Sequence, residues 1–286
     1  MTTTVQLSEL LAKVRYNSGV SAVEGLDPFR RMLENDADGA VLDFLKLEAP
    51  GLPDKIRGGI VFVLSEHYFK VGDMERIRAL FASGDPETRE ATLGALWGDP
   101  TAFALLGTGV VDMAIKATSD SAEGVRTEAC RVLQNQCAWK VDVSQAIRPL
   151  TGLLKDSAWR VRHQAAYAGG NFAAQKQYDL TGMVQPLTRN LAHENIYVRV
   201  ASAWALSKLV KRHDISPAVS QLTETLTSKD DYNAARKNAA GALLAWAKRS
   251  KDHAQSVQAA IAGLPLDRQR KEVARFLREL EALDRT

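Results

Sequence analysis

Few side chains in this chain have the types and spacing that catalysis or metal binding needs. The five histidines stand at positions 67, 163, 193, 213 and 253, and no two lie at the spacing of a metal site. The sequence contains no glycine-rich phosphate loop followed by Lys-Ser or Lys-Thr, and no Gly-x-Ser-x-Gly turn. We therefore expect no catalytic residue, no metal and no cofactor, and we predict that the protein is not an enzyme.

Arginine is the functional residue type whose spacing is regular. It recurs at positions 57, 89, 126, 162, 199, 236 and 270, at intervals of 32 to 37 residues. Small or apolar residues stand three, six and seven positions after the central arginines, as in Val125-Arg126-x-x-Ala129-x-x-Val132-Leu133. These offsets place them on one face of an α-helix. The arginines could bind phosphate, or they could tie neighbouring parts of the fold together.

The elements that must position these side chains are pairs of helices. A second stretch of helical apolar spacing precedes each arginine helix, as at Ile147, Leu150, Leu153 and Leu154. A polar turn such as Asp156-Ser157 joins the two. One such pair cannot bury its own apolar face, whereas stacked pairs can. The pattern predicts an all-α fold, an α-solenoid of about seven helix pairs, each with a helix A and a helix B.

The segments Asp156–Gly169 and Ala192–Leu206 resemble the B helix of HEAT repeats, and armadillo repeats are similar. The resemblance covers roughly residues 38–286 and implies a right-handed superhelix. It also implies that the repeat arginine pairs with an acidic group or a carbonyl of the neighbouring repeat. We expect residues 1–37 to form an N-terminal helical cap with a helix over 5–16. The B helices are expected near residues 54–70, 86–97, 123–139, 158–175, 195–212, 233–249 and 268–283.

B helices line the concave surface of proteins that this chain resembles. The positions five, nine and thirteen residues after the arginine point away from the core face. On the three central B helices these positions are Arg131, Asn135, Trp139, Tyr167, Asn171, Gln175, Trp204, Lys208 and Arg212. Aromatic rings offer contact area, and asparagine can hydrogen-bond a peptide backbone. We expect these nine residues to bind a partner protein or an extended peptide, which makes the protein a scaffold or adaptor.

Armadillo proteins that hold extended peptides use an aromatic residue followed four positions later by Asn. Tyr167 and Asn171 match that relation, Trp204 lacks the Asn, and Asn135 lacks the aromatic. The other tryptophans, Trp97, Trp159 and Trp246, fall off this pattern, and we expect them to pack between repeats.

Two other functions stay open. Residues 1–100 carry 11 Lys and Arg against 16 Asp and Glu, whereas residues 191–286 carry 16 against 11. The basic end includes Lys208, Lys211, Arg212, Lys248, Arg249 and Lys251, which could meet phosphates. A HEAT-like DNA glycosylase would use Trp139 and Asp142 in its groove. A HEAT-like chaperone or lyase subunit is the other alternative.

Composition sets the remaining limits. The chain has 286 residues, 45% of them hydrophobic and 25% charged, which is typical of globular proteins. Its apolar runs, such as Ile60–Leu64, are too short to span a bilayer. The first residues have no secretory signal pattern, and two cysteines cannot make a disulfide scaffold. We therefore expect a cytoplasmic protein without a membrane partner or a small-molecule substrate.

Overall fold

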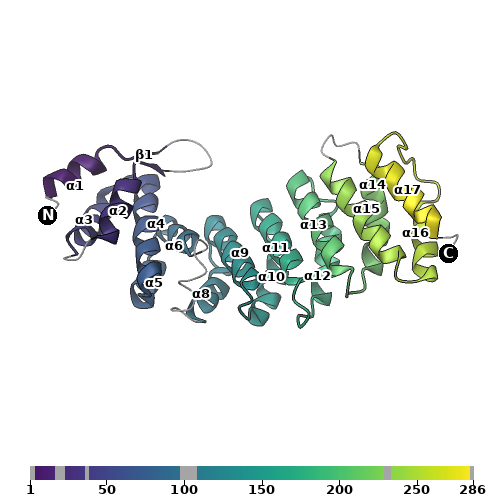
Figure 1. Cartoon of the computed structure of the whole chain (residues 1–286), viewed down its shortest axis with the longest axis horizontal. Helices are drawn as coiled ribbons and strands as arrows, with labels where there is room; N and C mark the ends of the chain where they lie inside the picture. The colour runs from purple at the N-terminus through teal and green to yellow at the C-terminus, as the bar shows by residue number, and fades with distance from the viewer. Residues whose placement is uncertain (1–3, 17–22, 36–38, 97–107, 229–232, 284–286) are drawn as a thin grey trace. The chain divides into compact units, whose positions relative to one another are not determined.

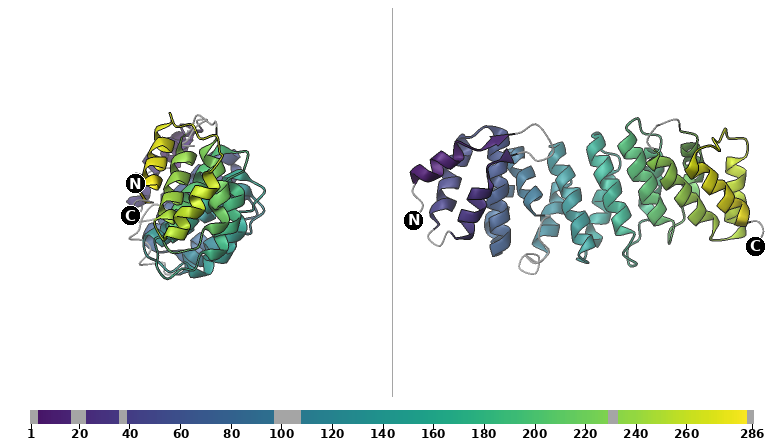
Figure 2. Two further views of the ribbon diagram at one scale, coloured as in Figure 1. Left: turned by 90° about the vertical axis from the view of Figure 1, so that its right-hand side faces the viewer. Right: turned by 45° about the horizontal axis from the view of Figure 1, so that its top comes forward.

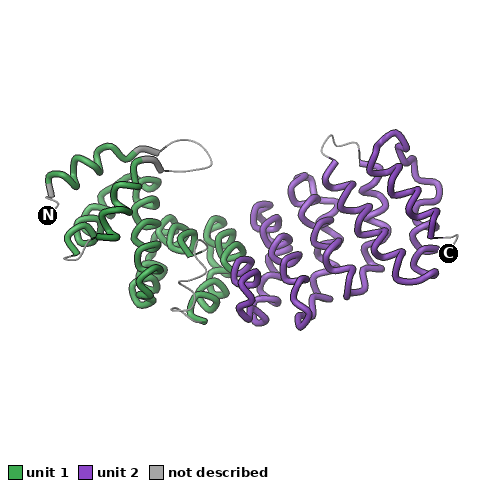
Figure 3. Tube along the Cα trace, viewed as in Figure 1, with its two compact units in different colours: residues 1–132 green, residues 133–286 purple. Residues whose placement is uncertain are grey.

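The chain is mostly helical, and its helices belong to two compact units. The computed structural model describes residues 4–16, 23–35, 39–96, 108–228 and 233–283. Figure 1 shows the elements in chain order, and Figure 2 shows them from two further sides. Unit 1 comprises Met1–Val132 and unit 2 comprises Leu133–Thr286, as coloured in Figure 3.

Unit 1 contains helices and a single two-stranded ladder among its described residues. Its elements are α1 (Thr4–Leu11), β1 (Arg15–Tyr16), β2 (Val23–Glu24), α2 (Asp27–Glu34), α3 (Ala40–Glu48), η1 (Ala49–Gly51), α4 (Asp54–Val71), α5 (Met74–Phe81), α6 (Pro86–Ala95), α8 (Gly109–Ala117) and α9 (Glu123–Ala138), which continues into unit 2. The strands are antiparallel and pair Arg15 with Glu24 and Tyr16 with Val23.

Unit 2 is helical throughout its described residues. After α9 it contains η2 (Ser144–Ala146), α10 (Ile147–Leu153), α11 (Trp159–Phe172), α12 (Thr181–Asn190), α13 (Ile196–Leu209), η3 (Ser216–Ala218), α14 (Val219–Leu226), α15 (Ala234–Ala247), α16 (Lys251–Ile261) and α17 (Lys271–Leu283). The B helices α11, α13, α15 and α17 pack side by side in this order (Figures 1 and 2).

Short polar side chains in the turns start the helices. Asp85 accepts a hydrogen bond from the Thr88 amide and caps α6, and Asn195 caps α13 by accepting from the Tyr197 amide. Asp120 and Asp156 accept from amides two residues further on, in the turns before α9 and α11. Aspartate recurs in these turns because its carboxylate satisfies amides that a helix start leaves open.

The small and apolar positions of the repeat form the core. Ala129, Ala165, Ser202 and Ala239 stand three residues after an arginine, and all four are fully buried. Leu133, Leu206 and Leu243 stand seven residues after it and are buried as well. Small side chains at the first position let neighbouring helices approach closely. The predicted all-α solenoid is confirmed in this respect.

The repeat arginines tie each turn to the helix that follows it. Arg126 donates to the carbonyls of Asp120 and Ser121, and Arg199 donates to those of His193 and Glu194. Others reach the next repeat: Arg57 contacts Asp85, Arg89 contacts Asp120, and Arg236 contacts Glu272. Arg57, Arg89 and Arg236 thus have the role that the resemblance implies, whereas Arg126 and Arg199 bond carbonyls of their own turn.

The N-terminal region differs from the expectation in one respect. The helix predicted over residues 5–16 ends at Leu11, and Arg15 and Tyr16 form a strand instead. Gly25 follows the partner strand with φ of 86°, and its backbone packs against Lys13 and Val14. This tight return needs a glycine and an extended chain, which helical spacing cannot reveal. The proposed domain limit between residues 37 and 38 stays a prediction.

Candidate functional site

Five aromatic rings from two neighbouring B helices of unit 2 lie in mutual contact. Trp159 and Tyr197 stack with ring centroids 5.9 Å apart. His163 and Tyr167 meet edge to face at 4.9 Å, and Tyr167 and Trp204 lie 5.1 Å apart. We call these five residues the aromatic stripe. Such ring pairs stabilise one another beyond the area that they bury.

Helical spacing and one glycine position the stripe. Trp159, His163 and Tyr167 are four residues apart on α11 and therefore share a face. The Trp204 ring, from α13, lies directly over Gly170, where a Cβ atom would come within 2.2 Å of it. Any larger residue would force the indole away from α11. Tyr197 remains 54% exposed, so the stripe presents aromatic surface to solvent.

Two cations of the same helices lie over stripe rings. The Arg160 guanidinium carbon is 4.9 Å from the Trp159 centroid, and the Lys208 Nζ atom is 5.3 Å from the Trp204 centroid. Both distances are within the range of cation–π contacts. The stripe is therefore an aromatic surface with positive charge placed on it.

Three of the nine residues predicted from the sequence come together here, namely Tyr167, Trp204 and Lys208. Asn171 follows Tyr167 on α11, and its Nδ2 donates to the Tyr167 carbonyl at 2.9 Å. Asn135 and Trp139 belong to unit 2 and are half-buried. Trp139 directly follows the last residue of α9. Their part in a binding site stays a prediction.

Arg131, another of the nine predicted residues, lies in unit 1. Its Nη1 atom donates to Glu128 Oε1 at 2.6 Å, and its side chain is half exposed. The arginine is therefore paired within its own helix, one turn after the carboxylate. No aromatic contact of Arg131 is found among the described residues.

Gln175 and Arg212 lie beyond the helices on which the spacing placed them. Helices α11 and α13 end at Phe172 and Leu209, three residues earlier than predicted. Gln175 donates to the Cys137 carbonyl at 3.1 Å, and Arg212 donates to the Ala173 carbonyl at 3.3 Å. Arg249 likewise donates to the Val210 and His213 carbonyls. In the structure, this position closes the end of the preceding B helix.

The spacing of the repeat arginines did not predict Trp159, His163 or Tyr197 as residues of the site. Trp159 was expected between repeats, and its stacking on Tyr197 of the next repeat agrees with that expectation. The signal for a shared surface was available in the spacing of 159, 163 and 167 along one helix. The offsets used in the prediction begin after the repeat arginine, so they do not include Trp159, which precedes Arg162.

Asp142, the residue that a glycosylase-like reaction would use, is engaged in a turn. Its carboxylate accepts from the Ser144 amide and hydroxyl and from the Tyr178 hydroxyl. The hydrogen bonds from Ser144 hold the pKa of Asp142 below its ordinary value. A carboxylate stabilised in this way is a weaker base.

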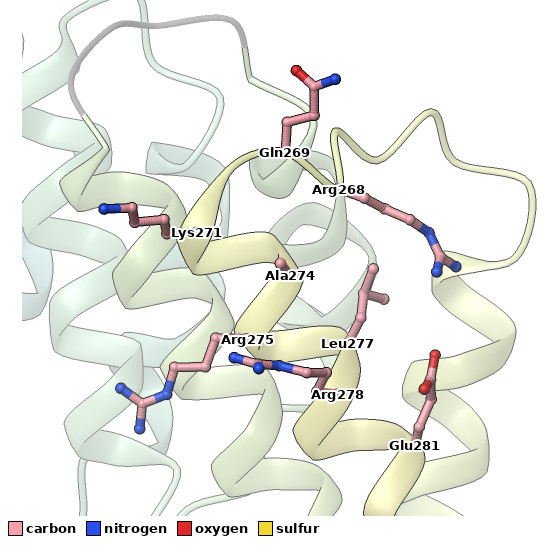
Figure 4. A pocket seen from close by; sticks show the side chains of 8 residues that line it. All are labelled: Arg268, Gln269, Lys271, Ala274, Arg275, Leu277, Arg278 and Glu281. Atoms are coloured by element: carbon pink, nitrogen blue, oxygen red, sulfur yellow. The ribbon is translucent and has the colours of Figure 1, made fainter.

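A second cationic region lies on the outer side of α17. Arg268, Lys271, Arg275 and Arg278 line a shallow pocket together with Ala274, Leu277 and Glu281. Figure 4 shows the guanidinium group of Arg268 pointing away from those of Arg275 and Arg278. Arg275 is already paired with Glu279 at 2.7 Å. The charges therefore do not converge on one point.

Within the described ranges, no group of three His, Cys, Asp or Glu side chains could hold a metal ion. No helix there is long and apolar enough to cross a membrane.

Comparison with known proteins agrees with the fold. Residues 74–170 match the protein family described as HEAT repeats. An engineered protein is 23% identical and has a TM-score of 0.61, covering 74% of this chain and 97% of that one. A designed armadillo repeat protein in complex with the peptide (KR)4 is 20% identical with a TM-score of 0.61, covering 75% of this chain and 99% of that one.

Two further solved structures show the same likeness. Computationally designed armadillo repeat proteins for modular peptide recognition are 19% identical with a TM-score of 0.59, covering 73% of this chain and 99% of theirs. Another engineered protein is 18% identical with a TM-score of 0.64, covering 97% of this chain and 73% of that one. Curated proteins gave no match. The fold defines an all-α solenoid. More particularly, it is a solenoid of the HEAT/armadillo-like kind, and residues 74–170 match HEAT repeats.

Proposed function

We propose that this protein is a non-enzymatic scaffold or adaptor that binds a partner protein, through an extended segment, on the B-helix surface of unit 2. The aromatic stripe is the observation that carries this proposal. Large aromatic side chains are enriched where proteins bind one another, because they bury much area at little entropic cost. Tyr197 is one of few large hydrophobic side chains that are more than half exposed among the described residues.

The solved relatives support a peptide as the form of the partner. One is a designed armadillo repeat protein in complex with a peptide, and another was designed for peptide recognition. Stacked B helices present a long surface that an extended chain can follow.

A peptide-display selection tests the proposal. Random dodecapeptides are selected on the full chain and then compared on Tyr197→Ala and on Tyr197→Ala/Trp204→Ala. We expect peptides whose affinity falls about 10-fold or more in both variants, as hot-spot truncation does. Circular dichroism checks that the variants are folded. Tyr197→Ala is the decisive variant because the exposed ring contributes little to the core.

The matched control is Leu47→Ala, which removes an apolar side chain that is also more than half exposed, from α3 of unit 1. It is expected to leave peptide affinity unchanged. If no selected peptide distinguishes Tyr197→Ala from Leu47→Ala, the stripe is not a binding surface and the proposal is wrong.

A further inference from the structure

Three B helices of unit 2, α11, α13 and α15, differ in charge from the earlier B helices and from α17, which carries three basic and three acidic residues. Helices α11, α13 and α15 carry six Lys and Arg residues and no Asp or Glu. Helices α4, α6 and α9 carry six basic and six acidic residues. All of these helices hold the same place in the repeat. The stripe therefore lies on two B helices, α11 and α13, that carry no carboxylate.

Half of the six cations serve the fold. Arg162 donates to the Asp156 carbonyl, and Arg199 donates to two carbonyls of its own turn. Arg236 is only 3% exposed and pairs with Glu272 at 2.7 Å. These three cannot turn toward a ligand without opening a turn or a buried ion pair.

The other cations lie on or beside the stripe. Arg160 and Lys208 are placed over the Trp159 and Trp204 rings. Lys237 directly follows its repeat arginine, so it holds on α15 the position that His163 holds on α11. Lys208 and Lys237 form no ion pair with any residue that the structure describes. A cationic ligand would have to displace Lys208 from the Trp204 ring, whereas a carboxylate could pair with Lys208 where it is.

A groove next to α15 extends the positive surface. It has a volume of about 560 Å³, lies between α15 and α17, and is lined by Lys237, Lys248, Lys271, Arg275, Glu272 and Glu279 among others. Its two carboxylates are already occupied: Glu272 pairs with Arg236, and Glu279 pairs with Arg275 and Lys248. Lys237 and Lys271 therefore leave uncompensated charge along the groove within the described part of the chain.

We propose that the aromatic stripe, with Lys208, Lys237 and Lys271, binds an acidic extended segment of a partner protein. The inference rests on the proposed function and specifies the partner's chemistry. Carboxylates of the segment pair with the lysines, and its apolar side chains contact the rings of Tyr197 and Trp204. A polynucleotide is a poorer fit, because its affinity comes from many phosphate contacts and only three lysines are available here.

The peptides that depend on Tyr197 supply the test. We expect them to contain a marked excess of Asp and Glu over Lys and Arg. Fluorescence polarisation with the best labelled peptide then compares two double variants of equal charge loss. Lys208→Gln/Lys237→Gln is expected to weaken binding about 10-fold at low salt. Arg268→Gln/Arg278→Gln, which removes the same charge near α17, is expected to change binding less than about 2-fold.

The other outcomes overturn the inference in distinguishable ways. Neutral or basic Tyr197-dependent peptides would refute the acidic partner and leave the scaffold function standing. The absence of any Tyr197-dependent peptide would refute both. Displacement of the labelled peptide by an equimolar eight-nucleotide oligothymidine would assign the stripe to nucleic acid. Self-association that disappears in Tyr197→Ala, measured by sedimentation, would assign it to a second copy of the chain.

Discussion

Among the repeat arginines, Arg89 bonds both its own turn and the carboxylate of the next repeat. Its Nε and Nη2 atoms contact both carboxylate oxygens of Asp120 at 2.8 Å, and its Nη1 donates to the Ser83 and Gly84 carbonyls. Both side chains are largely buried, at 14% and 12% exposure. A two-pronged, shielded ion pair of this kind is stronger than a surface pair.

We therefore expect Arg89→Ala to lower the free energy of unfolding by about 2 kcal/mol at pH 7. Arg76→Ala, which breaks the exposed pair with Asp73, is the control and is expected to cost less than about 1 kcal/mol. Urea unfolding followed by circular dichroism measures both. Equal losses would mean that burial of the Arg89 pair has no energetic effect.

The pH dependence of this pair has a defined sign. The hydrogen bond from Arg89 holds the pKa of Asp120 below its ordinary value. The pair therefore stabilises the fold fully above the unfolded pKa of about 3.9, and its contribution is lost as the pH falls through the lower folded pKa. The difference between wild type and Arg89→Ala should shrink below about pH 4.

Glu128 is a carboxylate with the opposite behaviour. It is 8% exposed, and burial raises its pKa to about 7. Arg131 donates to its Oε1, while its Oε2 has no hydrogen-bond partner among the described residues. Between the unfolded pKa of about 4.3 and the folded value, the fold holds a proton that the unfolded chain has lost. Stability therefore falls as the pH rises through this window.

Glu128→Gln removes the buried charge and keeps an acceptor for Arg131. It is expected to raise the free energy of unfolding by about 2 kcal/mol at pH 8, and the gain should disappear near pH 4.5. Glu75→Gln, at an exposed position on α5, controls for the general loss of negative charge. A gain for Glu128→Gln that is equal at both pH values would contradict burial as the cause of the raised pKa.

At the scale of elements, the contact between α11 and α13 depends on glycine. Gly170→Ala would put a Cβ atom 2.2 Å from the Trp204 ring, so either the ring or the helix must move. We expect a loss of about 1–3 kcal/mol in the free energy of unfolding, as overpacking causes. Gly241→Ala, in α15, has no atom within 4 Å of the new Cβ and should stabilise by about 0.5–1 kcal/mol. Urea unfolding distinguishes the two, and a stabilising Gly170→Ala would place Trp204 elsewhere.

How far the elements could be predicted follows from what repeats in the sequence. The arginine at constant spacing, with small residues such as Ala165 three positions later, predicts a helical solenoid, and that fold is confirmed. The ends of α11 and α13 could not be predicted in the same way. Beyond these ends, Gln175 and Arg212 donate to carbonyls of the preceding repeat. Such contacts depend on how neighbouring repeats stack, and the residue spacing within one helix does not indicate how they stack.

The stripe was predictable in part for a related reason. Tyr167 and Trp204 each stand five residues after a repeat arginine, and Lys208 follows Trp204 by one helical turn. Their offsets from the arginine therefore predict them. Tyr197 stands in the first turn of α13, before Arg199, and only positions after the arginine were considered. Its proximity to Trp159 arises because the first turns of neighbouring B helices lie side by side, which is a property of packing.

At the scale of the whole molecule, charge divides along the chain. Residues 1–132 carry 14 Lys and Arg against 20 Asp and Glu, and residues 133–286 carry 23 against 14. The stripe lies in the positive half. Binding of an acidic segment would therefore be assisted by the field of unit 2 and should weaken as salt is added, because salt screens exposed charges.

The repeat organisation also predicts how stability is distributed. Leu206 of α13 is fully buried, and α13 packs against α11, α12 and α15, all within unit 2. In repeat proteins each unit is stabilised by its neighbours, so damage spreads by steps. Leu206→Ala should lower the local free energy of opening by about 3 kcal/mol and accelerate amide exchange in α11, α13 and α15 about 100-fold.

Hydrogen exchange followed by mass spectrometry measures this peptide by peptide. Helices α4 and α5 of unit 1 are expected to keep their wild-type exchange rates in Leu206→Ala. Ile60→Ala, at a fully buried position of α4, is the matched variant and should accelerate α4, α5 and α6 while sparing α13. If either substitution accelerates both units equally, the chain opens as one cooperative body. Stability would then not be a sum of repeat and neighbour contributions, contrary to what the stacking of helix pairs implies.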